Sequence, residues 1–321
     1  MVVPAADLPD VLPSERLLAG GKAVPLLRSE LRRIPEWRSW LAVLLIWPEA
    51  VAIVAAAIWL SHPAAWVAAF VLMGRQYARF ASLGHEAVHR TLFTNRRLND
   101  FVGRWVLSYS TWVPFELYRR AHLNHHRDEM GPKEPDKALY RAYPITVASL
   151  RRKLIRDATG QTGLKLLRGL IKAAAKGKGP AMRILASQLV IVGLFTAADR
   201  PELYLLLWLL PHLTVWRVIN RLRSIAEHGG LMQSPDRRQT THDVKQSWLA
   251  SFWLVPYNIG FHLAHHVDMG VPNWNLPALQ AELVDSGWVT SGYTYPSYRA
   301  LWRALASAPT SAQETTSEIL T

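Results

Sequence analysis

Long apolar runs separated by charged stretches dominate the chain. Residues 41–60 form one run, which only a Pro-Glu pair interrupts, and residues 64–83 form a second, which carries Arg75 and Arg79 towards its far end. About 20 apolar residues suffice for a helix to cross a bilayer. The Ser-His-Pro segment between the runs is typical of a tight turn. The pattern predicts a hairpin of two membrane-spanning helices, whose arginines reach the headgroups or face the protein interior.

A second pair of apolar runs occupies residues 184–198 and 203–219, and a short charged turn joins them. Both runs are short for a full span, so they need tilt, flanking residues or local thinning of the bilayer. A buried helix pair of a soluble protein is the alternative. The first interpretation gives an all-α integral membrane protein with four transmembrane helices in two hairpins.

The remaining segments are shorter or more polar. Leu164, Leu167, Leu170, Ile171 and Ala174 recur at helical spacing among basic residues, which predicts an amphipathic surface helix. The Trp-rich segments 101–115 and 248–255 are too short or too interrupted to span, so we place them at the membrane interface or under a site. We expect one domain over residues 1–305 and a disordered tail over residues 306–321. Residues 1–10 do not resemble a cleavable signal peptide.

Charge sets the orientation. The formal net charge is +13, and residues 151–183 contain ten Lys or Arg and a single acid, Asp157. The segment 28–38 is also basic, whereas the two hairpin turns together hold one Arg. The positive-inside rule then places the N-terminus, the middle block and the C-terminus in the cytoplasm. Nucleic-acid binding is disfavoured, because no motif of that class accompanies the charge.

The chain has no cysteine, which excludes disulfides, Cys-ligated zinc and iron–sulfur clusters within it. It has 12 histidines, of which nine form a pattern. Three boxes read His-Glu-Ala-Val-His, His-Leu-Asn-His-His and His-Leu-Ala-His-His, and a ninth histidine stands alone between the second and third. The nine are His85, His89, His122, His125, His126, His228, His262, His265 and His266.

The spacing of the boxes predicts metal binding. On a helix, residues i, i+3 and i+4 share a face, so each box presents its imidazoles in one direction. The predicted topology brings all nine to the cytoplasmic membrane face. It excludes His62 at the opposite turn and His212 inside the fourth run, for which we expect structural roles; His242 is expected to be solvated. Nine nitrogen ligands suit two metals, and all-histidine sites with open positions favour redox iron.

The first box also satisfies the His-Glu-x-x-His motif of zinc proteases, with Glu86 as general base. That alternative uses two histidines and leaves seven without a role, since catalytic zinc takes about three protein ligands.

The boxes, their order and the two framing hairpins resemble the integral-membrane fatty acid desaturase superfamily, which includes hydroxylases and carotenoid ketolases. The resemblance covers residues 41–279. The segments Tyr-Asn-Ile-Gly-Phe-His at the third box and Val-Pro-Asn-Trp-Asn-Leu-Pro after it are similar to bacterial members. The resemblance implies a four-helix membrane part under a cytosolic helical cap, with a di-iron site between them that all nine histidines ligate.

The resemblance also raises a departure. Acyl-CoA desaturases place an Asn, a water-mediated ligand, four residues before the isolated histidine, and this chain has Ser224 there. Glu86, Glu227 and Asn258 are candidates to orient the ligating imidazoles.

The expected reaction is oxygen-dependent oxidation of an unactivated C–H bond in a lipid acyl chain, with desaturation first and hydroxylation of a lipid or other aliphatic substrate as the alternative. Two iron ions and molecular oxygen are expected, with electrons from an external ferredoxin or small haem-b protein fed by NAD(P)H. The expected location is a bacterial inner membrane, with the site on the cytoplasmic face. Candidates for contacts with an anionic headgroup or an acidic carrier are Arg119, Arg120, Arg127 and Lys133. Candidates to line a substrate tunnel are Trp105, Trp112, Trp248 and Trp253.

Overall fold

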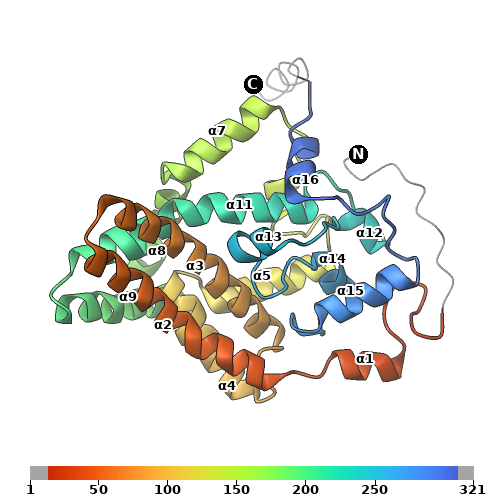
Figure 1. Cartoon of the computed structure of the whole chain (residues 1–321), viewed down its shortest axis with the longest axis horizontal. Helices are drawn as coiled ribbons and strands as arrows, with labels where there is room; N and C mark the ends of the chain where they lie inside the picture. The colour runs from red at the N-terminus through yellow and green to blue at the C-terminus, as the bar shows by residue number, and fades with distance from the viewer. Residues whose placement is uncertain (1–13, 310–321) are drawn as a thin grey trace.

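The computed structural model describes residues 14–309, and in that range every regular element is a helix. Three isolated β-bridges are the only extended pairings among these residues. The all-α prediction is therefore confirmed. Figure 1 gives the arrangement: α2, α3, α8 and α9 lie on the left, and α1, α12, α14, α15 and α16 lie on the right.

One set of helices comprises the segments of the two predicted hairpins and their neighbours, and α2, α3, α8 and α9 of this set lie on the left of Figure 1. The members of the set are α2 Glu36–Leu60, α3 Pro63–His89, α4 Arg96–Phe101, the π-helix η1 Val102–Ser108, the 3-10 helix η2 Tyr109–Thr111, α8 Gln161–Ala175, α9 Gly179–Ala197, the π-helix η3 Tyr204–Leu209 and α10 Leu210–Leu213.

The remaining helices carry the rest of the described chain. They are α1 Pro25–Leu31, α5 Phe115–Arg127, α6 Lys137–Tyr140, α7 Val147–Ala158, α11 Val215–His228, α12 Arg237–Thr240, α13 Trp248–Trp253, α14 His262–Val267, α15 Leu276–Asp285 and α16 Tyr298–Leu305.

The two helices of the first predicted hairpin are present as α2 and α3; that both span a membrane stays a prediction. Ser61 ends α2 in the left-handed conformation, and the His62 ring accepts a hydrogen bond from the Ala64 amide at the start of α3. This N-cap is the structural role expected for His62. Helix α3 runs six residues beyond the predicted end at residue 83, so the first histidine box forms its last turns.

Polar residues inside this hairpin are paired with one another. Glu49 of α2 forms an ion pair with Arg79 of α3, and Gln76 donates to the Ile46 carbonyl at 2.8 Å beside Pro48. The Arg75 guanidinium reaches further and donates to the Phe252 carbonyl at 2.8 Å. Both arginines therefore face protein partners, one of the two outcomes expected for them.

The second hairpin differs from its prediction. Helix α9 begins five residues before residue 184, and the run 203–219 is not one helix but η3, α10 and the start of α11. Pro211, within α10, has no amide hydrogen to donate, and the backbone leaves the helical conformation three residues later at Thr214, where φ is −122° and ψ is −84°. The Arg217 guanidinium donates to the His212 carbonyl at 3.1 Å and so supplies a hydrogen-bond partner beside this break. His212 is buried there, which fits its expected structural role.

Two segments are long and apolar enough to cross a membrane, namely Pro25–Leu60, which contains α2, and Gly179–Ala197, which is α9. Only 28% and 22% of their most apolar windows are buried. Leu44, Val51, Leu189 and Leu194 are among their exposed side chains. A buried pair of soluble helices would hide such residues, so the exposed apolar belt favours the membrane interpretation of these two helices.

Close backbone approaches lock the hairpin helices to the rest of the fold. Gly74 of α3 lies directly against Val215 of α11, where a β-carbon has no room. A β-carbon at Gly103 of η1 would lie 2.6 Å from that of Ala87 in the last turns of α3. The helix that carries the first box is thereby held from two sides.

Two hydrophobic cores flank those last turns of α3. One contains residues of α2, α3, η1, α5 and α9, and the other contains residues of α11, α14, α15, α16 and the segment around Tyr140. The amphipathic helix predicted around Leu164 is present as α8, and α13 in the Trp-rich segment has no buried residue.

The predicted tail begins earlier than the folded part of the chain ends. Ser307 forms an antiparallel bridge with Thr146, and the Ala308 amide donates to the Ile145 carbonyl at 3.2 Å. The prediction for residues 310–321, like that for residues 1–10, lies outside the described range.

Candidate metal centre

The nine histidines of the predicted pattern come from four helices and meet between the two cores. Helix α3 brings His85 and His89, α5 brings three, the last residue of α11 is His228, and α14 brings three. Eight of the nine are buried, and His89 is partly buried.

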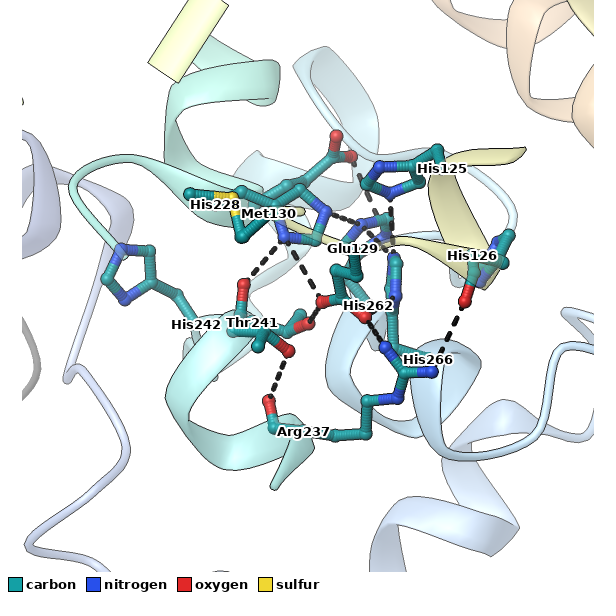
Figure 2. Close-up of polar contacts among 12 residues, drawn as sticks. His125, His126, Glu129, Met130, His228, Arg237, Thr241, His242, His262 and His266 are labelled. Carbon is teal, nitrogen blue, oxygen red and sulfur yellow. Dashed lines mark hydrogen bonds and ion pairs between the residues drawn. The ribbon is translucent and has the colours of Figure 1, made fainter. Parts of the chain in front are cut away.

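The ring nitrogens divide into two groups, within each of which the potential ligand atoms all lie within 4.8 Å of one another. The five-histidine group contains His85, His89, His122, His126 and His265. The four-histidine group contains His125, His228, His262 and His266. Figure 2 shows the whole four-histidine group together with His126.

This division corrects the expectation that each box points in one direction. In α5, His122 and His126 join the five-histidine group while His125 joins the other. In α14 the assignment is reversed, because His262 and His266 join the four-histidine group while His265 does not. Neighbouring helical residues diverge by about 100°, so each His-x-x-His-His box contributes to both groups.

Within each group the Nε2 atoms converge. In the five-histidine group they are 2.8 Å apart between His89 and His122, and 3.0 Å between His126 and His265. In the four-histidine group they are 3.0 Å apart between His228 and His262, and 3.0 Å between His262 and His266. The lone pairs of such convergent nitrogens repel one another unless a proton or cation lies among them.

Burial favours the neutral form of most of these imidazoles; at His125 the hydrogen bond and charge of Glu134 raise the pKa instead. Burial lowers the pKa of His122, His126, His262, His265 and His266 well below the usual value, and neighbouring imidazoles lower it further. A neutral imidazole has a free lone pair, which is the form that ligates metal. In addition, both ring nitrogens of His85 are buried without a hydrogen-bond partner. The donor set therefore fits two metal ions held by nitrogen ligands.

Two buried carboxylates that sequence reasoning missed lie behind the four-histidine group. Glu129 accepts a hydrogen bond from His266 Nδ1 at 2.9 Å and another from the Thr241 hydroxyl at 2.6 Å, and it pairs with Arg237 (Figure 2). Glu134 accepts one from His125 Nδ1 at 2.7 Å. The only signal in the sequence is that both acids follow the second box within a few residues.

Two of the three predicted orienting residues, Glu86 and Glu227, lie beside the centre. A Glu86 oxygen is 3.7 Å from His85 Nδ1, and that carboxylate accepts hydrogen bonds from the Thr91 hydroxyl and the Asn273 amide. A Glu227 oxygen is 3.8 Å from His262 Nδ1 and binds Arg223 at 2.6 Å.

Asn258 has a different surrounding. Its side chain makes no hydrogen bond to any described residue, and its φ of 62° places it in a left-handed turn before the third box. The Ser224 hydroxyl donates to the Asn220 carbonyl of its own helix at 2.8 Å. An Asn at that position would offer an amide in place of this hydroxyl.

His242 is not solvated, contrary to expectation. It is 4% exposed, and its Nε2 donates to the Gly229 carbonyl at 2.8 Å. Burial lowers the pKa of His242 to about 4. The loop that holds it follows α12 and packs against the end of α11, which the polar sequence around it did not indicate.

The candidate surface residues separate into two kinds. Arg119 is engaged, since it donates to the carbonyls of Ala87 and Val88 and to Asp100. Arg120, Arg127 and Lys133 are exposed.

The candidate tunnel tryptophans separate in the same way. Trp105 and Trp248 are exposed, whereas Trp112 and Trp253 are partly buried. Trp112 has its ring 6.2 Å from that of His212.

Comparison with known proteins yields one family and three relatives. The sequence model of the family "Fatty acid desaturase" matches residues 61–300, which include all nine histidines. The chain is 23% identical over 240 residues to dihydrorhizobitoxine desaturase of Bradyrhizobium elkanii, covering 68% of each protein. It is 24% identical over 298 residues to a probable fatty acid desaturase of Sorghum bicolor, covering 80% of this chain and 75% of the relative. It is 25% identical over 197 residues to zeaxanthin 4-ketolase of Chlamydomonas reinhardtii, covering 60% of this chain and 39% of the relative.

Proposed function

The chain belongs to the fatty acid desaturase family, and from that premise we propose that it desaturates a lipid acyl chain at a di-iron centre, using molecular oxygen. The observation that carries the proposal is the division of nine buried histidines into groups of five and four, each with convergent Nε2 atoms. The five-histidine group would hold one iron and the four-histidine group the other. Iron in such a nitrogen environment supplies oxygen activation and cleavage of an unactivated C–H bond.

The protein's own contribution is placement and exclusion of water. The histidines are fixed by four helices that the two cores hold together, so the ligands are positioned before metal arrives. Burial keeps bulk water away and favours neutral imidazoles at residues such as His126 and His266.

The zinc protease alternative needs Glu86 free to act as a general base. Glu86 is buried and accepts hydrogen bonds from Thr91 and Asn273. The alternative also leaves seven clustered histidines without a role.

Forming a carbon–carbon double bond from two methylene groups removes two hydrogens, and reduction of oxygen to two waters takes two further electrons from outside the chain. An external ferredoxin or small haem-b protein, fed by NAD(P)H, is the proposed donor. The exposed cations Arg120, Arg127 and Lys133, on and beyond the helix of the second box, support an acidic carrier as partner.

Hydroxylation is the second candidate. One relative is a ketolase by name, and Ser224 departs from the acyl-CoA desaturase pattern. The two outcomes differ in whether a second hydrogen leaves the substrate or a hydroxyl group is added to it. Lipid profiling under labelled oxygen distinguishes them: desaturation gives an unsaturated chain without label, and hydroxylation gives a labelled alcohol.

For the location we propose a multi-pass protein of a bacterial inner membrane, with the metal centre on the cytoplasmic face. The exposed apolar surfaces of α2 and α9 support membrane insertion. The basic residues of α7 and α8 support the orientation. A reporter fused after Arg168 should be cytoplasmic, and a periplasmic reporter there would contradict the topology.

The decisive experiment compares a host expressing the protein with hosts expressing His265→Ala and His126→Ala. Both variants should lose the lipid product and the iron of the five-histidine site, whereas His62→Asn, which preserves the cap of α3, should keep the product and both irons. Retention of two irons and of product by both alanine variants would refute the proposed centre. A purified protein with one zinc and no iron would instead support the protease.

A further inference from the structure

The two histidine groups differ in what stands behind their rings. An imidazole that ligates through Nε2 carries its proton on Nδ1, and the partner of that Nδ1–H fixes the ring and tunes the basicity of the ligating nitrogen. The two groups can therefore be compared by the hydrogen-bond partners of their Nδ1 atoms.

In the four-histidine group three of the four Nδ1 atoms have hydrogen-bond partners. His125 donates to Glu134 at 2.7 Å, His266 donates to Glu129 at 2.9 Å, and His228 donates to the Thr240 carbonyl at 2.8 Å. The fourth, His262, has its Nδ1 3.8 Å from the carboxylate of Glu227.

In the five-histidine group no Nδ1 atom donates to any residue of the described range. The Nδ1 atoms of His85 and His265 are buried and without a partner. The nearest carboxylate is Glu86, whose Oε1 lies 3.7 Å from His85 Nδ1, beyond hydrogen-bond distance, while Thr91 and Asn273 both donate to its Oε2.

The carboxylates behind the four-histidine group are themselves fixed. Glu129 is buried, and Arg237 and Thr241 hold its two oxygens (Figure 2). Glu134 is held by the Tyr140 hydroxyl at 3.1 Å and by the Asp136 amide at 3.0 Å. An oriented carboxylate of this kind both locks the imidazole tautomer and makes its Nε2 a stronger donor.

We propose that the two half-sites are inequivalent: the four-histidine site is the pre-organised, high-affinity site that fills first, and Glu129 and Glu134 are its positioning residues. The inference rests on the proposed function in so far as that function requires two metals. It goes further by assigning an order of filling and two residues outside the ligand set. The five-histidine site, which has more ligands but no carboxylate support, is the weaker one.

The test is an anaerobic titration of the metal-free full-length protein in detergent with ferrous iron, at fixed neutral pH. Iron retained after gel filtration is counted, and Mössbauer spectra with the iron-57 isotope are recorded at one and two equivalents. We expect two steps for the unmodified protein and a single spectral species after the first equivalent. His265→Ala, which damages the five-histidine site, should keep the tight first step, and His266→Ala should lose it.

Two carboxylate variants test the positioning residues. Glu129→Gln and Glu134→Gln keep the shape of the side chain and remove its charge, and each should weaken the first step about 10–100-fold. Glu86→Gln is the matched control, because it alters the carboxylate beside the other group, and it should leave the first step unchanged.

The outcomes are separable. Two equal binding steps, or loss of the tight step in His265→Ala but not in His266→Ala, would overturn the inference and leave the proposed function intact. Failure of the unmodified protein to bind iron would instead overturn the proposed function. If a carboxylate variant does not fold, the pair of histidine variants still decides the order of filling.

Discussion

Replacement of Arg119 by methionine should destabilise the end of α3 and empty the five-histidine site. The guanidinium donates to the Ala87 carbonyl at 2.7 Å, to the Val88 carbonyl at 3.1 Å and to Asp100 at 2.6 Å. The carbonyls belong to the last turn of α3; the Arg90 amide, at 3.2 Å, also binds that of Ala87, but no backbone amide of the described residues binds that of Val88. His85 and His89 lie within and next to that turn.

The three acceptors that Arg119 binds differ in whether another donor lies nearby. Without Arg119, the Ala87 carbonyl keeps the Asn99 amide at 2.9 Å, and Asp100 keeps Arg90 and Arg104 nearby. The Val88 carbonyl has no such substitute. An unsatisfied buried acceptor costs about 1–3 kcal/mol, and a lost hydrogen bond to a charged group about 1.5–3 kcal/mol. With the substitutes allowed for, we expect a loss of about 2–4 kcal/mol.

The matched control is Arg120→Met, because Arg120 is the next residue in α5 and is exposed. Thermal unfolding followed by circular dichroism should place Arg119→Met roughly 3–6 °C below the unmodified protein. Arg120→Met should lie within about 0.5 kcal/mol of it. Iron analysis should give one iron per chain for Arg119→Met, retained in the four-histidine site. Equal stability and equal iron in the two variants would refute the capping role.

Three further predictions follow from other contacts. His242 is buried and neutral with a pKa of about 4, below its unfolded value, so its contribution to stability is present above about pH 6.5 and is lost as the pH falls towards 4. The size is about 3 kcal/mol, and His242→Gln should flatten that part of the stability curve; an unchanged slope would contradict this. Glu49→Gln leaves Arg79 of α3 without its ion-pair partner and should cost about 2–4 kcal/mol in denaturant unfolding, whereas Glu202→Gln in the exposed turn should cost little. Because the chain lacks cysteine, single spin labels can be attached at introduced cysteines. A label at Trp248→Cys, where the side chain is exposed on α13, should be accessible to membrane-dissolved oxygen, and a label at Lys133→Cys should be accessible to a water-soluble nickel complex. A label at residue 248 that is accessible only to nickel would exclude lipid contact.

Helix-scale features were predictable because they depend on local periodicity. The hairpin of α2 and α3 and the amphipathic helix α8 follow from apolar spacing, and the structure contains them. The prediction of one helix over the fourth run was wrong, because the backbone leaves the helical conformation at Thr214, where Arg217 of the next helix binds the His212 carbonyl. Apolar composition alone does not distinguish one straight helix from three connected ones.

The membership of the centre was predictable, but its division and its support were not. A box of i, i+3 and i+4 histidines looks like one ligand cluster, yet residues 125 and 126, like residues 265 and 266, diverge by about 100° and enter different groups. Glu129 and Glu134 lie beyond the end of α5, and the chain turns there with Met130 at a φ of 59°. Tertiary contacts with Arg237 and Thr241, about a hundred residues away, bring Glu129 to His266.

This exchange of histidines between α5 and α14 has a consequence for the centre as a whole. Each helix supplies ligands to both groups, so the separation of the two half-sites is fixed by the geometry of single helical turns and not by the packing of whole helices. A small shift of α14 against α5 therefore moves ligands of both half-sites together. By contrast, α3 serves only the five-histidine group and α11 only the four-histidine group, so changes in those helices act on one half-site at a time. The loss of one iron expected for Arg119→Met, at the end of α3, depends on this arrangement.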